Sequence, residues 1–350
     1  MKHINIPIFI PHLGCPNQCI FCNQRYISGT EIFCEDDVKN QIDQVLSTVT
    51  NEKCEIAFFG GSFTGIDRSL MIRLLDLAQE YINIGKASGI RMSTRPDYIS
   101  KEITDILSKY SISCVELGIQ TINDDVLKVL KRGHTARDSI EAINCLKKAG
   151  LPFAGQMMIG LPKASLDDEI NTARFIAENG AIGARIYPTV VFNNTELAQM
   201  YNCKEYSPLS EDDAVFRSAK ALNVFVKADI PCFRIGLCDS ENLHSDETFV
   251  AGPNGPSIGE RVKSRLFFDI IVEQIYLLRL DKGDSIIIEC PKGKASQIIG
   301  LRKENIVKLK DKFDFKEIKV LENESLVNFN IKILKKEDNH ALKITWTSRF

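Results

Sequence analysis

Three cysteines near the start of the chain, Cys15, Cys19 and Cys22, form a Cys-x3-Cys-x2-Cys array. Closely spaced thiolates are soft ligands that suit zinc or an iron–sulfur cluster. A structural zinc site is one interpretation, with His12 or a distant cysteine as the fourth ligand. Because zinc sites usually pair two ligand couples, the spacing favours an iron–sulfur cluster.

The composition indicates an ordinary globular protein. The chain has 350 residues, of which 44% are apolar and 26% are charged. Its N-terminus lacks the features of a signal peptide, and no run reaches the roughly 18 apolar residues of a membrane helix. We therefore expect a cytoplasmic protein with no membrane partner, whose eleven cysteines stay reduced.

Short apolar runs alternate with segments of helical period up to about residue 236, and the cysteine array directly follows the first run. Strands separated by amphipathic helices predict repeated βα units and a parallel sheet. Six units favour an α/β fold, an incomplete (β/α)6 barrel, in which chemistry gathers at the carboxyl ends of the strands. The expected strands are Ile4–Ile10, Glu55–Phe59, Ile90–Ser93, Cys114–Ile119, Phe153–Ile159 and Ala184–Val191. The expected helices are Asp36–Val49, Ser69–Ile82, Ser100–Lys109, Arg137–Ala149, Leu166–Asn179 and Asp212–Ala228.

The alternation ends after Cys238, where glycines and prolines between residues 251 and 256 indicate a loop. A long helix is expected over Gly259–Arg279. A small α+β domain should follow, with strands at Ser285–Cys290, Ile318–Leu321, Val327–Leu334 and Leu342–Trp346, and two short helices around Gly300. We thus expect a core barrel over residues 1–240, a loop and connecting helix over 241–283, and a basic domain over 284–350.

The cysteine spacing, with Phe21 before the third cysteine, resembles the signature of the radical S-adenosylmethionine (SAM) superfamily. The resemblance implies that Cys15, Cys19 and Cys22 hold three irons of a 4Fe–4S cluster, and that SAM binds the fourth iron. Reductive cleavage of SAM then gives methionine and a 5′-deoxyadenosyl radical, which abstracts hydrogen from the substrate. It also implies an electron donor such as flavodoxin or ferredoxin, and Phe21 counts among the cofactor-binding residues.

Further segments extend this resemblance. Gly60-Gly61-Ser62 resembles the motif that holds the SAM amino group, with Ser62 in place of a common glutamate. Segments 91–97, 116–121, 131–135 and 156–162 resemble the Elongator catalytic subunit and the oxygen-independent coproporphyrinogen dehydrogenases. By position, the resemblance implies that Gln120 and Arg132 reach the SAM ribose and carboxylate, and that Gln156 reaches the ribose. The 94 residues from 257 onward are too few and wrongly patterned for the acetyltransferase domain of the Elongator branch.

The C-terminal part is basic. Residues 257–350 carry 19 Lys+Arg against 14 Asp+Glu, although the whole chain has a net charge of −2. Residues 297–306, around Gly300, resemble the helix–loop–helix of KH RNA-binding domains, in which a Gly-x-x-Gly turn clamps the nucleotide backbone. Lys303 replaces the second glycine, which should weaken close backbone approach. RNA, including tRNA, is therefore an expected partner, and a solvated charged face is the structural alternative.

Two questions stay open in the sequence. Cys203, Cys232 and Cys238 form a second metal site in one interpretation, but their spacing matches no compact ligand pattern. The main interpretation is a radical SAM enzyme that modifies RNA, and the alternatives are a small-molecule or peptide substrate, or a non-catalytic zinc- and RNA-binding protein. No side chain is assigned a catalytic role after hydrogen abstraction.

Overall fold

The computed structural model describes residues 3–16, 18–23, 33–49, 53–237, 245, 247–336 and 341–342. Two compact units are present: Met1–Ser210 with Ile230–Asn254, and Glu211–Asp229 with Gly255–Phe350. None of the helices within the described ranges combines the length and the apolar character needed to cross a bilayer.

The first unit is built on a parallel sheet of seven strands in the order β1-β2-β3-β4-β5-β6-β8, which leaves β1 and β8 as edges. The strands are β1 (His3–Phe9), β2 (Lys53–Phe59), β3 (Gly89–Thr94), β4 (Ile112–Gln120), β5 (Phe153–Ile159), β6 (Gly183–Pro188) and β8 (Cys232–Ile235). An open parallel α/β sheet of an incomplete barrel is the predicted fold class, which is confirmed. The seventh strand, β8, is absent from the sequence-based expectation.

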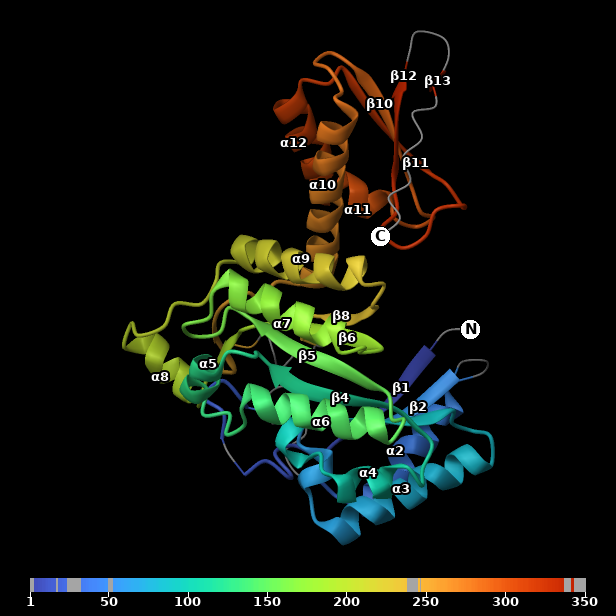
Figure 1. Cartoon of the computed structure of the whole chain (residues 1–350), viewed down its shortest axis with the longest axis vertical. Coiled ribbons are helices and arrows are strands. Elements are labelled where there is room, and N and C mark those ends of the chain that lie inside the picture. Colours follow the sequence, from blue (N-terminus) through green and yellow to red (C-terminus); the bar gives the residue numbers. More distant parts are fainter. Residues whose placement is uncertain are drawn as a thin grey trace. The chain divides into compact units, whose positions relative to one another are not determined.

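In the described part of this unit, seven helices connect or flank the strands. They are α2 (Asp36–Ser47), α3 (Arg68–Asn83), α4 (Lys101–Leu107), α5 (Asp124–Val129), α6 (Ala136–Lys148), α7 (Leu166–Glu178) and α8 (Glu196–Asn202). Figure 1 shows α6 and α7 running along one face of the sheet beside β4 and β5. The predicted helix starts are explained by capping, since Thr135 and Ser165 each form a capping box, with Asp138 and Asp168.

The two faces of the sheet differ in polarity. Along β4, the apolar residues Val115, Leu117 and Ile119 alternate with Glu116, Gly118 and Gln120. On β5, Gly155 lies against Ile176 of α7, so the odd-numbered positions of that strand face the helices. The apolar positions therefore form the core with the helices, and the polar ones line the concave face.

The second unit contains two long helices and a small sheet. Helices α9 (Glu211–Lys227) and α10 (Ile258–Leu278) belong to it, with α11 (Ala295–Ile299) and α12 (Glu304–Phe313). Its sheet has the order β11-β10-β12-β13, with β10 (Ser285–Cys290), β11 (Glu317–Glu322), β12 (Lys332–Lys336) and β13 (Ala341–Leu342). The strand expected over Val327–Leu334 begins only at Lys332, and residues 343–346 of the last expected strand lie outside the described residues.

Candidate active site

The cysteine array lies in the loop that follows β1, at the carboxyl end of the sheet. Cys19 is buried, whereas Cys15 and Cys22 are partly buried. Burial raises the pKa of the Cys15 thiol, the positive charges of Arg132 and Arg95 oppose that rise, and Cys19 and Asp97 add to it. In the described part of the chain, no three His, Cys, Asp or Glu side chains are arranged to hold a metal ion.

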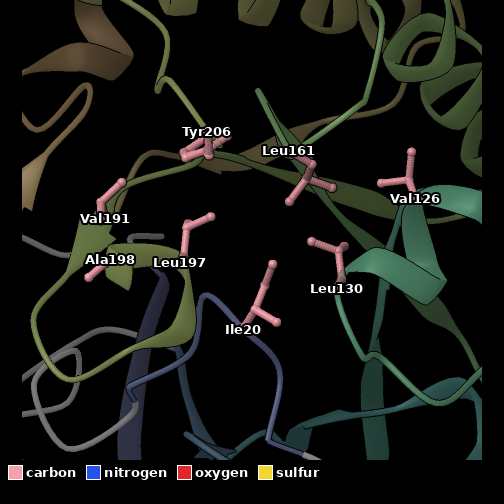
Figure 2. Packing of buried hydrophobic residues seen from close by; sticks show 8 residues of the cluster. All are labelled: Ile20, Val126, Leu130, Leu161, Val191, Leu197, Ala198 and Tyr206. Atoms are coloured by element: carbon pink, nitrogen blue, oxygen red, sulfur yellow. The ribbon is translucent and has the colours of Figure 1, made fainter. Parts of the chain in front are cut away.

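Ile20, between the second and third cysteines, fastens this loop to the barrel. Its amide donates to the Leu130 carbonyl at 3.2 Å, and its carbonyl accepts from the Leu197 amide at 2.8 Å. Its side chain is buried in an apolar cluster, shown in Figure 2, whose other labelled members are Val126, Leu130, Leu161, Val191, Leu197, Ala198 and Tyr206. Phe21 packs against the same cluster. The loop is therefore held from both α5 and α8.

The Gly60–Gly61 turn after β2 lies directly against the cysteine loop. A Cβ at Gly61 would overlap the carbonyl oxygens of Ile10 and Leu13, and one at Gly14 would overlap the Ser62 carbonyl. Gly60 also has a φ of +89°. The glycines thus allow two backbones to approach each other, which only a missing side chain permits.

The Ser62 hydroxyl is fully buried and engaged within the protein. It accepts from the Arg95 amide at 3.1 Å and lies 2.9 Å from the Thr94 hydroxyl. Thr64 donates to the Tyr98 carbonyl and therefore accepts from Thr94, 2.6 Å away, so the Ser62 hydrogen must go to Thr94. One lone pair of Ser62 is left for any ligand, and its role toward a cofactor stays a prediction.

Arg132 brings the end of β4 and the cysteine loop together. Its guanidinium donates to Cys19 Sγ at 3.4 Å and to the Gly118 carbonyl at 3.0 Å. A Cβ at Gly118 would lie 2.7 Å from Arg132 and 3.0 Å from the Gln120 amide nitrogen, so glycine makes room for both side chains. Arg132 Nε and Gln120 Oε1 are buried without a partner among the described residues.

His134 lies two residues further along the same loop. It is buried, and its pKa is lowered to about 4 because burial disfavours its charged form and the positive charge of Arg132 adds to this. At neutral pH it is an uncharged side chain in the wall of the site.

Gln156 lies on the concave face within a buried ionic network. The Glu116 carboxylate is fully buried and pairs with Arg91 at 3.1 Å and with Arg185 at 2.6 Å. Gln156 Nε2 donates to Glu116 at 2.7 Å and to Ser93 at 3.1 Å, while Arg91 also binds Glu55 at 2.8 Å. A carboxylate accepts only, so it fixes the orientation of the Gln156 amide and leaves Oε1 as the acceptor.

Arg95 and Asp97, in the segment after β3, are site residues to which the sequence assigned no role. Arg95 pairs with Asp97 through two hydrogen bonds of 2.9 and 2.7 Å, and its charge interacts with those of Cys15 and Cys19. An Arg-x-Asp pair directly after a strand is the sequence signal that could have indicated them.

The second metal site left open by the sequence gains no support in the described residues. Cys203 is exposed, Cys232 is partly buried, and no candidate metal-binding group contains either of them. Cys238 lies outside the described residues.

An open parallel sheet with a cysteine loop after its first strand is the arrangement of enzymes that generate radicals within an incomplete (β/α) barrel. Residues 9–176 match the Radical SAM superfamily model, and residues 182–267 match the Radical_SAM C-terminal domain model. The chain belongs to the radical SAM superfamily and is a radical SAM enzyme. The cofactors of this family are SAM and a 4Fe–4S cluster, as the resemblance implied.

Several relatives extend the comparison. An uncharacterized protein of Methanocaldococcus jannaschii is 31% identical over 61% of this chain and 69% of its own length. The tRNA uridine(34) acetyltransferase of the same organism is 35% identical, over 35% of this chain and only 24% of its own length. The solved structure of Methanocaldococcus infernus Elp3 superposes with a TM-score of 0.60 at 20% identity, over 82% of this chain and 71% of that one. The match to the acetyltransferase supports the predicted likeness to the Elongator-type branch, and the superposition shows the fold alone.

Proposed function

We propose that this radical SAM enzyme modifies RNA, with its cluster bound by Cys15, Cys19 and Cys22. The observation that carries the cofactor assignment is the position of Arg132, whose guanidinium donates to Cys19 and keeps one buried nitrogen without a partner. A cation at the edge of the cysteine loop suits the carboxylate of SAM.

The residue types present suit both cofactors, although in the described structure no three of these side chains are arranged around one metal ion. Three thiols in one loop supply ligands for three irons and leave the fourth open. The buried, unpartnered Gln120 Oε1 and Arg132 Nε supply one acceptor and one donor beside this loop, which a ribose hydroxyl and a carboxylate would satisfy. The oriented acceptor of Gln156 suits a second hydroxyl of the ribose.

The cluster, when bound, supplies one electron to SAM, and the cleavage yields the 5′-deoxyadenosyl radical that abstracts hydrogen. The protein's own residues provide position and shielding. Arg132 orients the carboxylate, the Gly60–Gly61 turn offers backbone groups to the amino group, and Phe21 and Ile20 keep the apolar side of the loop dry. Glu116, through its ion pairs, keeps the Gln156 acceptor in place.

The cofactor assignment is tested by anaerobic incubation with SAM and dithionite. Release of 5′-deoxyadenosine, and its loss in Cys19→Ala, are the expected results. Cys203→Ala is the matched control, because Cys203 is an exposed cysteine outside the array and its loss should leave the yield unchanged. A cluster-loaded protein that releases no 5′-deoxyadenosine would contradict the proposal.

The RNA assignment rests on the second unit and on the named relatives. Between α11 and α12, Gly300, Arg302 and Lys303 have φ values of 78°, 49° and 65°. Lys303 thus adopts the left-handed conformation that a glycine would favour, so the sharp turn is kept although glycine is replaced. The turn is stabilised by Asn305 Nδ2, which donates to the carbonyls of Gln297 and Ile298 at 3.3 and 3.1 Å.

The charges at this turn are available to an anion. Arg302 and Lys303 at the turn are exposed, as is Lys310 in the last turn of α12, and none of the three forms an ion pair with a carboxylate of the described residues. Lys292 and Lys336, by contrast, pair with Glu324 at 2.7 Å and with Glu317 at 2.8 Å. Uncompensated cations next to a sharp exposed turn suit the phosphates of a single-stranded RNA.

Binding of RNA to the whole chain as a function of salt tests this assignment. The slope of log K against log salt is negative, and each phosphate contact makes it more negative by about 0.7 for single strands. The triple variant Arg302→Gln, Lys303→Gln, Lys310→Gln should make the slope less negative by roughly 2, and Lys292→Gln with Lys336→Gln should change it little. Equal losses in both sets would refute a site at the turn.

The remaining parts of the proposal concern the surroundings of the reaction. We include an electron donor of the flavodoxin or ferredoxin class and a cytoplasmic location. A small molecule or peptide as substrate is the second candidate, which absence of RNA binding at low salt would favour. Family membership argues against the non-catalytic zinc protein.

A further inference from the structure

The segment after β3 contains a buried arginine that the roles above do not use. Only 2% of the Arg95 side chain is exposed. Its Nε and one terminal nitrogen donate to the two Asp97 carboxylate oxygens, at 2.9 and 2.7 Å. The other terminal nitrogen is buried and has no partner among the described residues. Leaving such a donor unsatisfied costs about 1–3 kcal/mol, so an acceptor is expected there.

The surroundings of Arg95 indicate which acceptor this is. Its charge interacts with those of Cys15 and Cys19, and the Asp97 charge also reaches Cys15. The two terminal nitrogens of Arg132 already donate to Cys19 Sγ and to the Gly118 carbonyl of β4. The Arg95 amide donates to the Ser62 hydroxyl, and the Ser62 carbonyl lies against Gly14, so Arg95 lies beside the residue that precedes Cys15. The acceptor that these contacts indicate is negatively charged sulfur, as a ligating thiolate or a sulfide of the cluster.

We propose that Arg95, oriented by Asp97, is a positioning residue that sets the reduction potential of the cluster. This inference rests on the proposed function, because it requires the cluster at Cys15, Cys19 and Cys22. One-electron reduction by the external donor adds a negative charge to the cluster without making or breaking a bond. A buried cation with a donor to sulfur stabilises the reduced state and raises the potential. Asp97 orients the Arg95 guanidinium through two hydrogen bonds, and its negative charge offsets part of the effect of the guanidinium on the potential.

The two partners should consequently act in opposite directions. Arg95→Met removes the cation, and the potential should become more negative. Asp97→Asn leaves the cation uncompensated, and the potential should become less negative. For each variant we expect about a tenfold change in the ratio of reduced to oxidised cluster at a fixed solution potential. A tenfold change corresponds to a shift of 59 mV in the reduction potential of a one-electron couple. A merely structural role for the pair would move both potentials in the same direction or neither.

The measurement is a redox titration of reconstituted full-length protein, followed by electron paramagnetic resonance, with iron and sulfide assayed in each variant. The matched control is the pair of Arg73 and Glu35, which has the same two-bond geometry at 2.7 and 2.9 Å but is about half exposed. Arg73→Met and Glu35→Gln should leave the potential unchanged, since solvent screens exposed charges. Arg95→Lys, which keeps the charge, should restore part of the shift.

The outcomes distinguish failure of this inference from failure of the proposed function on which it rests. Opposite shifts with full cluster content support the role of Arg95. Shifts of the same sign in both variants, or changes below about twofold in the ratio of reduced to oxidised cluster, overturn the role of Arg95. The proposed function is then retained, because the wild-type protein still binds its cluster. If Arg95→Met loses its cluster, Asp97→Asn decides alone, because its side chain is 24% exposed and tolerates an amide. A wild-type chain that takes up no cluster overturns both.

Discussion

Replacing Gly118 with alanine displaces Arg132 more than any other side chain and so tests its contribution to SAM binding. The new Cβ would lie 2.7 Å from the Arg132 guanidinium, and ordinary contact begins near 3.4 Å, so the guanidinium must move by roughly 0.7 Å. That shift disturbs its bonds to Cys19 and to the Gly118 carbonyl. A hydrogen bond of a charged group contributes about 1.5–3 kcal/mol, so SAM affinity should fall roughly 10- to 150-fold.

The stability of the protein should change much less. Gly118 does not have a positive φ, and the displaced atoms are the ends of flexible side chains. The free energy of unfolding of the cluster-free protein should therefore change by no more than about 1 kcal/mol. Denaturant unfolding measures this quantity, and the dependence of 5′-deoxyadenosine formation on SAM concentration measures the affinity.

A double variant shows whether the effect passes through Arg132. When Arg132→Met is already present, Gly118→Ala should cost little further in SAM dependence, because only the smaller crowding of the Gln120 amide, at 3.0 Å, remains. Additive losses, or normal SAM dependence in Gly118→Ala alone, would refute the assignment of Arg132 to the SAM carboxylate.

Three further outcomes are expected. Ile20→Ala should lower the free energy of unfolding of the cluster-free protein by about 2–5 kcal/mol, measured in urea, and a loss below 1 kcal/mol would contradict the fastening role of Ile20. Asn305→Ala should cost about 1–3 kcal/mol and weaken RNA binding with unchanged 5′-deoxyadenosine release, and retained RNA binding would show that the turn is not the contact. His134 has a pKa of about 4 in the folded protein and 6.5 in the unfolded chain, so the unfolded chain takes up this proton first as the pH falls. The free energy of unfolding should therefore keep its full value above pH 6.5 and decrease by at most about 3 kcal/mol as the pH falls toward 4. His134→Gln should flatten that part of the unfolding profile of the cluster-free protein, and an unchanged slope would contradict the low pKa.

The main strands of the barrel were predictable because each is a compact apolar run bounded by loop residues. Strand β8 was missed because it has only four residues and exposes 39% of Phe233, so its pattern resembles a loop. Helices α5 and α8, of six and seven residues, were also missed, whereas the equally short α4 was predicted from the segment 100–109. Their existence depends on packing against Ile20, which only the folded structure shows.

The candidate site, like the fold, could be predicted from the sequence only in part. The spacing of Cys15, Cys19 and Cys22 identified the loop, because ligand chemistry is visible in residue types. The commitment of the Ser62 hydroxyl to Thr94, and the pairing of Arg95 with Asp97, depend on which strand ends meet. Such contacts are set by the register of parallel strands, and no local pattern in the chain records them.

The fastening of Ile20 has a consequence for the order of biosynthesis. One of its two backbone partners, Leu197, lies 177 positions further along the chain. The cysteine loop, although made first, obtains its final shape only after α8 has been synthesised and has docked. We therefore expect iron and sulfide to be delivered after α8 has been synthesised, to a folded loop and not to the emerging N-terminus.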